Sequence, residues 1–89
     1  MNATAILVMA GNYEQFELYR RSRGLSPNAL IYLHRPYTAR RNEGAILVKT
    51  GNWNRRRDRR AIEQLIAQGH FTDVRVEETV PASNFHRGN

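Results

Sequence analysis

Four segments of the chain carry apolar patterns typical of β-strands. Residues 4–10 (TAILVMA), 29–34 (ALIYLH) and 45–50 (AILVKT) are nearly continuous apolar runs, which indicate strands buried on both faces. Residues 72–80 instead alternate valines with charged side chains, a pattern typical of a half-exposed edge strand. We therefore expect three buried strand segments, the first of them central, and one half-exposed strand at a sheet edge.

Two segments between these runs have the spacing of amphipathic helices. In residues 12–24, Asn12 is a candidate N-cap with Gln15 three positions on, and tyrosine and phenylalanine side chains repeat along one side. Residues 54–68 place isoleucine and leucine at core spacing. Residues 37–44 are polar and basic and predict an irregular segment.

The order strand, helix, strand, strand, helix, strand predicts one small α/β domain over residues 1–80. Right-handed βαβ crossovers then give a mainly parallel sheet of strand order 2-1-3-4, which is half of a doubly wound, Rossmann-like sheet. We expect one helix on each face, or both on one face if the middle connection folds differently. Residues 81–89 are polar and predict a disordered tail.

The first and third strand segments end in the same kind of turn. Residues 6–13 (ILVMAGNY) and 46–53 (ILVKTGNW) are identical at five of eight positions. Two buried strands that each end in Gly-Asn look alike even without an internal repeat. In a 2-1-3-4 sheet, however, both turns lie at the topological switch point, where such sheets usually bind ligands.

These two turns contain residue types suited to a ligand site. Glycine lets the backbone approach a ligand closely or adopt positive φ, asparagine caps a helix or donates its amide, and an aromatic ring offers a flat apolar face. The predicted switch-point residues are Gly11, Asn12, Tyr13, Gly51, Asn52 and Trp53.

Basic residues are concentrated in the middle of the chain. Of the 14 lysines and arginines, twelve lie between Arg20 and Arg60, opposed there only by Glu43 and Asp58. All but Lys49 are arginine, whose forked donors suit phosphate and carboxylate groups. A GC-rich genome would also favour arginine, but it would not explain the clustering.

Arginines also crowd the predicted start of the second helix, where cations are unfavourable. The helix dipole opposes each cation there by roughly 0.3–1 kcal/mol. A bound anion would turn this repulsion into attraction, because free backbone N–H groups and guanidinium groups would converge on it. A solvated charge run is the alternative interpretation. The predicted binding residues are Arg55, Arg56, Arg57, Arg59 and Arg60, with Arg35, Arg40 and Arg41 before the third strand segment.

Aromatic residues are interleaved with these arginines. Trp53 directly precedes the arginine run, and Tyr37 is close in sequence to Arg35, Arg40 and Arg41. Rings beside cations are typical of surfaces that bind single-stranded nucleic acid. Such rings at strand ends also pack against a core, so both interpretations stay open.

Several kinds of chemistry have no support in the sequence. Without cysteine there is no thiolate metal site or thiol nucleophile, and neither glycine turn is a phosphate-binding loop of known pattern. The histidines are not spaced for zinc. His34 with Glu43 or Asp58 would make an acid/base pair, but a lone histidine at a strand end is more often structural. We therefore expect no enzyme, cofactor or metal.

Neither a membrane span nor an export signal is expected. The longest apolar run covers residues 5–10, far fewer than the roughly 20 residues that a membrane helix needs. No charged leader followed by a long apolar stretch opens the chain. The sequence therefore predicts a cytoplasmic protein with no membrane partner.

The layout of residues 4–68 permits one comparison with known proteins. A buried strand ends in Ala10-Gly11-Asn12, a tyrosine-rich helix leads to Tyr32, and a third strand ends in Gly51-Asn52-Trp53 before a second helix. This layout resembles small bacteriophage and prophage accessory proteins, which commonly carry AGN and GTW turns at these places. The resemblance implies a phage origin and a location in the host cytoplasm, and it implies no catalytic residues.

Three functions are compatible with these features. The favoured one is a non-enzymatic binding protein whose arginine-rich face engages nucleic acid or nucleotide phosphate. The second is a host-takeover or anti-defence protein that binds and inhibits an acidic or nucleic-acid-binding host protein. The third is a small enzyme on a phosphorylated substrate, with His34 as acid or base. A homodimer is a further possibility, in which the last strand would pair with another chain.

Overall fold

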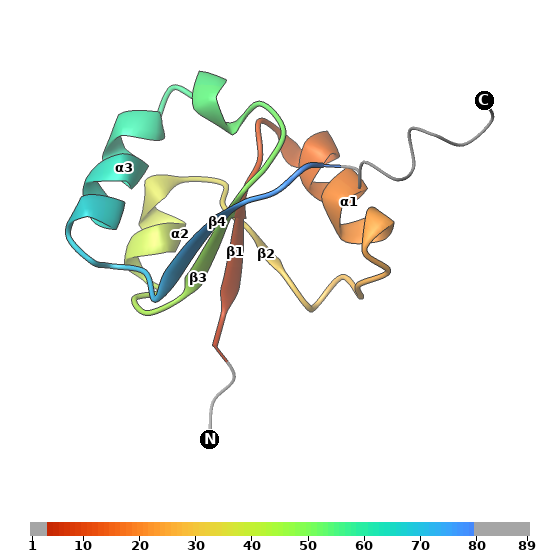
Figure 1. The fold of residues 1–89 in the computed structure, drawn as a ribbon, viewed down its shortest axis with the longest axis horizontal. Coiled ribbons are helices and arrows are strands. Elements are labelled where there is room, and N and C mark those ends of the chain that lie inside the picture. Colours follow the sequence, from red (N-terminus) through yellow and green to blue (C-terminus); the bar gives the residue numbers. More distant parts are fainter. Residues whose placement is uncertain (1–3, 80–89) are drawn as a thin grey trace.

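Four parallel strands form one sheet in the computed structural model, which describes residues 4–79 (Figure 1). The strand order is β2-β1-β3-β4, so the predicted fold class is confirmed. The predicted tail at residues 81–89 lies outside the described residues. The elements in chain order are β1 (Ile6–Met9), α1 (Tyr13–Ser22), β2 (Ile31–Tyr32), α2 (Pro36–Arg40), β3 (Ile46–Lys49), the 3-10 turn η1 (Trp53–Arg55), α3 (Arg59–Ala67) and β4 (Asp73–Val76).

The two similar strand segments lie side by side in register. β1 pairs with β3 from Ile6 opposite Ile46 to Met9 opposite Lys49. Each identical residue of the Ile-Leu-Val segment therefore faces its counterpart, and the two Gly-Asn turns leave the sheet next to each other. The predicted switch point thus lies between the carboxyl ends of β1 and β3.

β1 is buried on both faces because side chains alternate along a strand and helices cover both sides. Leu7 and Met9 belong to a core cluster with Ala39 of α2 and Ile62 of α3. Val8 and its neighbours instead pack in a second cluster with the aromatic residues of α1. Figure 1 shows this division, with α1 on one side of the sheet and α2 and α3 on the other.

The helix α2 occupies a segment that the sequence predicts to be irregular, so that prediction is wrong. Pro36 stands in the first turn, where its missing N–H removes no helical hydrogen bond, and Ala39 is fully buried. Five residues are too few to show a helical period in the sequence. Because α2 packs beside α3, the middle connection crosses β1 on the α3 side.

The helix α3 begins at Arg59, five residues later than predicted. The chain first makes the turn η1, and Arg56 then adopts an extended backbone (φ −67°, ψ 144°) that separates this turn from the helix. The prediction that Arg55, Arg56 and Arg57 lie in the first helical turn is therefore wrong. None of the helices described between residues 4 and 79 has the length and apolar character needed to cross a membrane.

Both outer strands are more exposed than the inner ones. β2 is a two-residue edge strand in which Ile31 is exposed, so its predicted burial on both faces is wrong. The adjoining Leu30 and Leu33 are buried and produce the apolar run seen in the sequence. β4 is the opposite edge strand, as predicted, but it is more exposed than its alternating pattern indicates, because Val76 faces solvent (67% exposed) and Val74 is only half-buried.

Candidate anion-binding site

The switch point between β1 and β3 is closed by a side chain of α1. The side-chain oxygen of Gln15 accepts hydrogen bonds from the backbone N–H groups of Gly11 (2.9 Å) and Asn52 (2.8 Å). A Cβ atom on Gly11 or on Gly51 would overlap this oxygen, and Gly51 also has a positive φ of 60°. The predicted need for glycine is confirmed, but the group that approaches the backbone is Gln15.

The two turn asparagines have different roles. The side chain of Asn12 accepts a hydrogen bond from the backbone N–H of Gln15 at 2.9 Å and so caps α1, as predicted. Asn52 makes no side-chain cap and contributes its backbone N–H to Gln15 instead. Both turns are thereby used to fix the position of α1 against the sheet.

Arg56 is tied into the protein and is not free to bind an anion. Its side chain is only 7% exposed and forms a forked pair with the carboxylate of Asp58, at 2.9 and 2.8 Å. The same guanidinium donates to the backbone oxygens of Ala10 (2.9 Å) and His34 (3.3 Å). It therefore links the carboxyl ends of β1 and β2.

The other arginines of the basic segment fall into two groups. On α1, Arg20 and Arg21 pair with Glu17, and Arg23 pairs with Glu77. The hydrogen bond from Arg20 holds the pKa of Glu17 below its usual value. On the opposite side of the sheet, exposed arginines around α2 and α3 have no ion-pair partner within residues 4–79. These are Arg35, Arg40, Arg41, Arg55, Arg57 and Arg60, which we call the arginine face.

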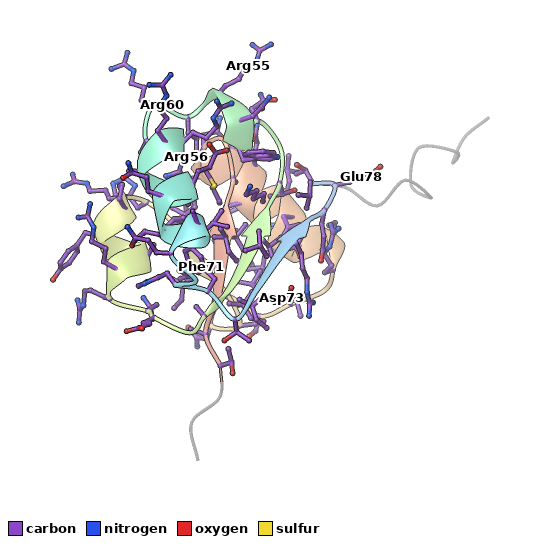
Figure 2. All side chains as sticks on the ribbon, turned by 60° about the vertical axis from the view of Figure 1, so that its left-hand side comes forward. Arg55, Arg56, Arg60, Phe71, Asp73 and Glu78 are labelled. Atoms are coloured by element: carbon purple, nitrogen blue, oxygen red, sulfur yellow. The ribbon has the colours of Figure 1, made fainter. Side chains whose placement is uncertain are left out.

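Three members of the arginine face line one open depression of about 540 Å³ at the carboxyl end of the sheet. These members are Arg35, Arg55 and Arg57. Arg56 and Asp58 also line the depression, but their opposite charges are paired. Figure 2 shows Arg55 extending outward, whereas Arg56 turns in toward the sheet. The depression therefore carries three positive charges without a counter-charge.

The remaining members of the arginine face lie outside this depression. Arg41 lines a separate hollow with Ala5 and Gly44, which precede β1 and β3, so it lies at the amino end of the sheet. Arg40 is its exposed neighbour at the end of α2. Arg60 extends outward from the first turn of α3 (Figure 2). Arg59, also predicted to bind, is half-exposed and lies 3.6 Å from Glu63.

The comparisons with known proteins come out negative. Neither protein-family models, nor curated proteins, nor solved structures match this chain. The resemblance to phage accessory proteins therefore stays a prediction.

Trp53 is not part of the depression. Its ring is half-buried against the core cluster of α2 and α3, and the ammonium of Lys49 lies 4.4 Å from the ring centroid. It lines a different hollow, together with Leu18 and Val76. The packing interpretation of this tryptophan is therefore the one that the structure favours.

His34 makes no acid/base pair within residues 4–79. Its ring lies beside Tyr32, with the ring centroids 5.9 Å apart. The carboxylate of Asp58 accepts from Arg56, and Glu43 lines the hollow at the amino end of the sheet. That part of the chain also contains no group of three histidine, aspartate or glutamate residues placed to hold a metal ion.

The segment after β4 covers the α1 side of the sheet end. The Tyr19 hydroxyl donates to the carboxylate of Glu77 at 2.7 Å, and burial together with this bond raises the pKa of Tyr19 to about 12. Arg23 stacks 4.0 Å above the Tyr19 ring and donates to the backbone oxygen of Thr79. The arginines next to this segment are therefore paired, whereas unpaired arginines adjoin the open depression at the start of α2.

Two residues central to this geometry, Gln15 and Arg56, have roles that differ from their sequence-based assignments. Gln15 stands at the capping-box position, which predicts a bond back to Asn12 rather than a bridge between two turns. Its proximity to the second turn follows only once the 2-1-3-4 order places both turns together. In the sequence, only Asp58 two positions on distinguishes Arg56 from the other arginines of the run.

Proposed function

We propose that the protein binds nucleic acid or nucleotide phosphate through the arginine face, centred on the depression lined by Arg35, Arg55 and Arg57. The observation that carries this proposal is the selective pairing of charge. The arginines of α1 and its C-cap pair with nearby acids, whereas these three line one depression whose acid, Asp58, pairs with Arg56 instead. Guanidinium groups bind phosphate oxygens through forked hydrogen bonds, which makes phosphate a fitting ligand.

The distribution of the arginine face favours an extended ligand. Arg35 and Arg41 lie at opposite ends of α2, roughly 9 Å apart along the helix axis at 1.5 Å per residue. One phosphate group placed in the depression would leave Arg40 and Arg41 at the amino end of the sheet unused. A chain of phosphates would contact both ends, and its binding would release several condensed counterions. We therefore favour a nucleic acid over a free nucleotide.

The proposal is tested by fluorescence anisotropy with single- and double-stranded DNA and RNA at about 50 and about 200 mM salt. We expect binding at low salt that weakens steeply at high salt. The double variant R55Q/R57Q should lose at least about tenfold in affinity, because it removes two charge-assisted phosphate contacts.

A matched control is R21Q/R75Q, which removes the same charge from arginines that pair with Glu17 and Asp73. This control should change affinity by less than about threefold, since neither arginine lines the depression. It should also stay folded, since each exposed ion pair contributes little to stability. Absence of binding to every nucleic acid at low salt would refute the proposal, as would equal losses in the two double variants.

An acidic host protein would contact the same arginines, so this alternative needs its own measurement. The tagged protein is incubated with host lysate before and after nuclease treatment. The proposal predicts that co-purifying macromolecules are lost after nuclease treatment. A stoichiometric protein partner that survives the nuclease, together with no oligonucleotide binding, would favour the host-protein function instead.

A further inference from the structure

Three rings form a row that leads to the arginine depression. The rings of Tyr13 and Tyr32 have centroids 5.5 Å apart and meet edge to face, and those of Tyr32 and His34 are 5.9 Å apart. Tyr13 begins α1, whereas Tyr32 and His34 lie at the end of β2. Tyr32 and His34 also line the depression beside Arg35. The aromatic row and the unpaired arginines are thus one continuous surface.

The rings of this row keep surface that faces solvent. Tyr13 is 57% exposed, His34 is exposed and Tyr32 is half-buried. The neighbouring Phe16 is 4% exposed and supplies the aromatic contribution of α1 to the core. The outer rings of the row therefore retain faces or edges on which another flat group can pack.

The aromatic residues that the sequence nominates for stacking are less suitable. Trp53 packs between the core and Lys49, away from the depression. Tyr37 is exposed, but the guanidinium of Arg41 lies 5.6 Å from its ring centroid. The row of Tyr13, Tyr32 and His34 is therefore the aromatic surface that adjoins the unpaired arginines.

We infer that this surface binds single-stranded nucleic acid, with phosphates at Arg35, Arg55 and Arg57 and with bases stacked on the row of Tyr13, Tyr32 and His34. The inference rests on the proposed function and adds which form of nucleic acid is preferred. In a duplex the base faces stack on one another inside the helix and are out of reach of protein rings. Unpaired bases expose their faces, and rings beside a basic groove bind them with little dependence on sequence.

The sharpest test compares three ligands of equal length on the native protein: an oligothymidine, an abasic deoxyribose-phosphate strand and a duplex. The abasic strand keeps the phosphates but has no base to stack. Stacking of one base on an aromatic ring raises affinity by about tenfold. We therefore expect oligothymidine to bind at least that much more tightly than the abasic strand. It should also bind more tightly than the duplex at the same salt concentration.

Variants then assign the stacking to the row. Tyr13→Leu and His34→Leu should weaken oligothymidine binding and narrow its advantage over the abasic strand, with an unchanged salt dependence. Tyr37→Leu is the matched control, because Tyr37 is 60% exposed and lies outside the row. It should leave the advantage of oligothymidine over the abasic strand unchanged. Thermal melts check that each variant is folded, and the ligand comparison on the native chain needs no variant.

The possible results distinguish a failure of this inference from a failure of the proposed function. Equal affinity for oligothymidine and the abasic strand, or tighter binding of the duplex, would overturn the single-strand inference while leaving phosphate binding in place. If Tyr13→Leu and His34→Leu both keep the full advantage of oligothymidine over the abasic strand, the bases do not stack on the row. Failure of all three ligands to bind at low salt would overturn the proposed function itself, and the inference with it.

Discussion

At the scale of single residues, the protein fills its own switch point. Gln15 bridges the turns that follow β1 and β3, and Arg56 bonds to the backbone just after β1 and β2. In doubly wound open sheets in general, ligands commonly bind at this point. Here a carboxamide oxygen accepts from the N–H groups of Gly11 and Asn52, and a guanidinium group donates to the carbonyls of Ala10 and His34. The candidate site consequently lies beside this point, in the depression between the end of β2, the start of α2 and η1.

Replacement of Arg56 should destabilise the fold. Arg56→Gln removes both bonds to Asp58 and leaves that carboxylate, whose side chain is 22% exposed, without its counter-charge. We expect the free energy of unfolding to fall by about 2–3 kcal/mol, less than for a fully buried pair. Urea denaturation measures this value. Arg57→Gln is the control and should change it by less than about 0.5 kcal/mol, because Arg57 is exposed; similar losses in both would contradict the structural role.

Alanine substitutions at Gly51 and Gly24 distinguish the stability cost of backbone strain from the cost of steric overlap. Both have positive φ, 60° and 66°, but only a Cβ at position 51 would overlap Gln15, whereas nothing lies within 4 Å of a Cβ at position 24. Gly24→Ala should therefore cost about 1 kcal/mol through strain alone. Gly51→Ala should cost clearly more, because it also displaces the Gln15 bridge. Equal melting temperatures of the two variants would show that the Gln15 bridge contributes nothing to stability.

At the scale of elements, the contact between α1 and the segment after β4 makes stability depend on pH. The unfolded chain loses the Tyr19 proton near pH 10, whereas the folded protein keeps it until about 12. Between these values the folded state binds more protons, so stability is complete below pH 10 and falls as pH rises toward 12. The loss amounts to roughly 2–3 kcal/mol.

Tyr19→Phe tests this link because it keeps the ring beneath Arg23 but has no hydroxyl. The variant should be less stable near neutral pH, since Glu77 loses its hydrogen-bond donor. Its stability should fall less between about pH 10 and 12 than that of the native protein. Parallel pH profiles for the two proteins would contradict the assigned pKa shift.

The sequence predicts the two inner strands β1 and β3 well, whereas the equally apolar run at residues 29–34 gives only the two-residue edge strand β2. β1 and β3 follow from their continuous apolar segments, and the parallel order follows from the crossover rule. α2 is too short to show a period, and the start of α3 depends on Arg56 leaving helical geometry to reach Ala10. The adjacency of the two glycine turns is predictable from the sheet order. Their closure by Gln15 is a tertiary contact that no local pattern contains.

At the scale of the whole molecule, charge is divided between the two sides of the sheet. The chain carries a net charge of +6, and the α1 side holds arginines that are paired with Glu17 and Glu77. The unpaired excess lies around α2 and α3, on the arginine face. This separation gives a polyanion one side of the molecule to approach, and it explains why removal of equal charge from the two sides should have unequal effects.

The salt dependence of oligonucleotide binding tests the central claim most directly. Each phosphate contact contributes about 0.7 to the slope of log affinity against log salt for a single strand. The triple variant R35Q/R55Q/R57Q should therefore flatten the slope by about 2 as its affinity falls. Its melting temperature should stay close to that of the native protein, because none of the three arginines pairs with an acid in residues 4–79. An unchanged slope and affinity in a folded triple variant would show that these arginines do not form the anion site.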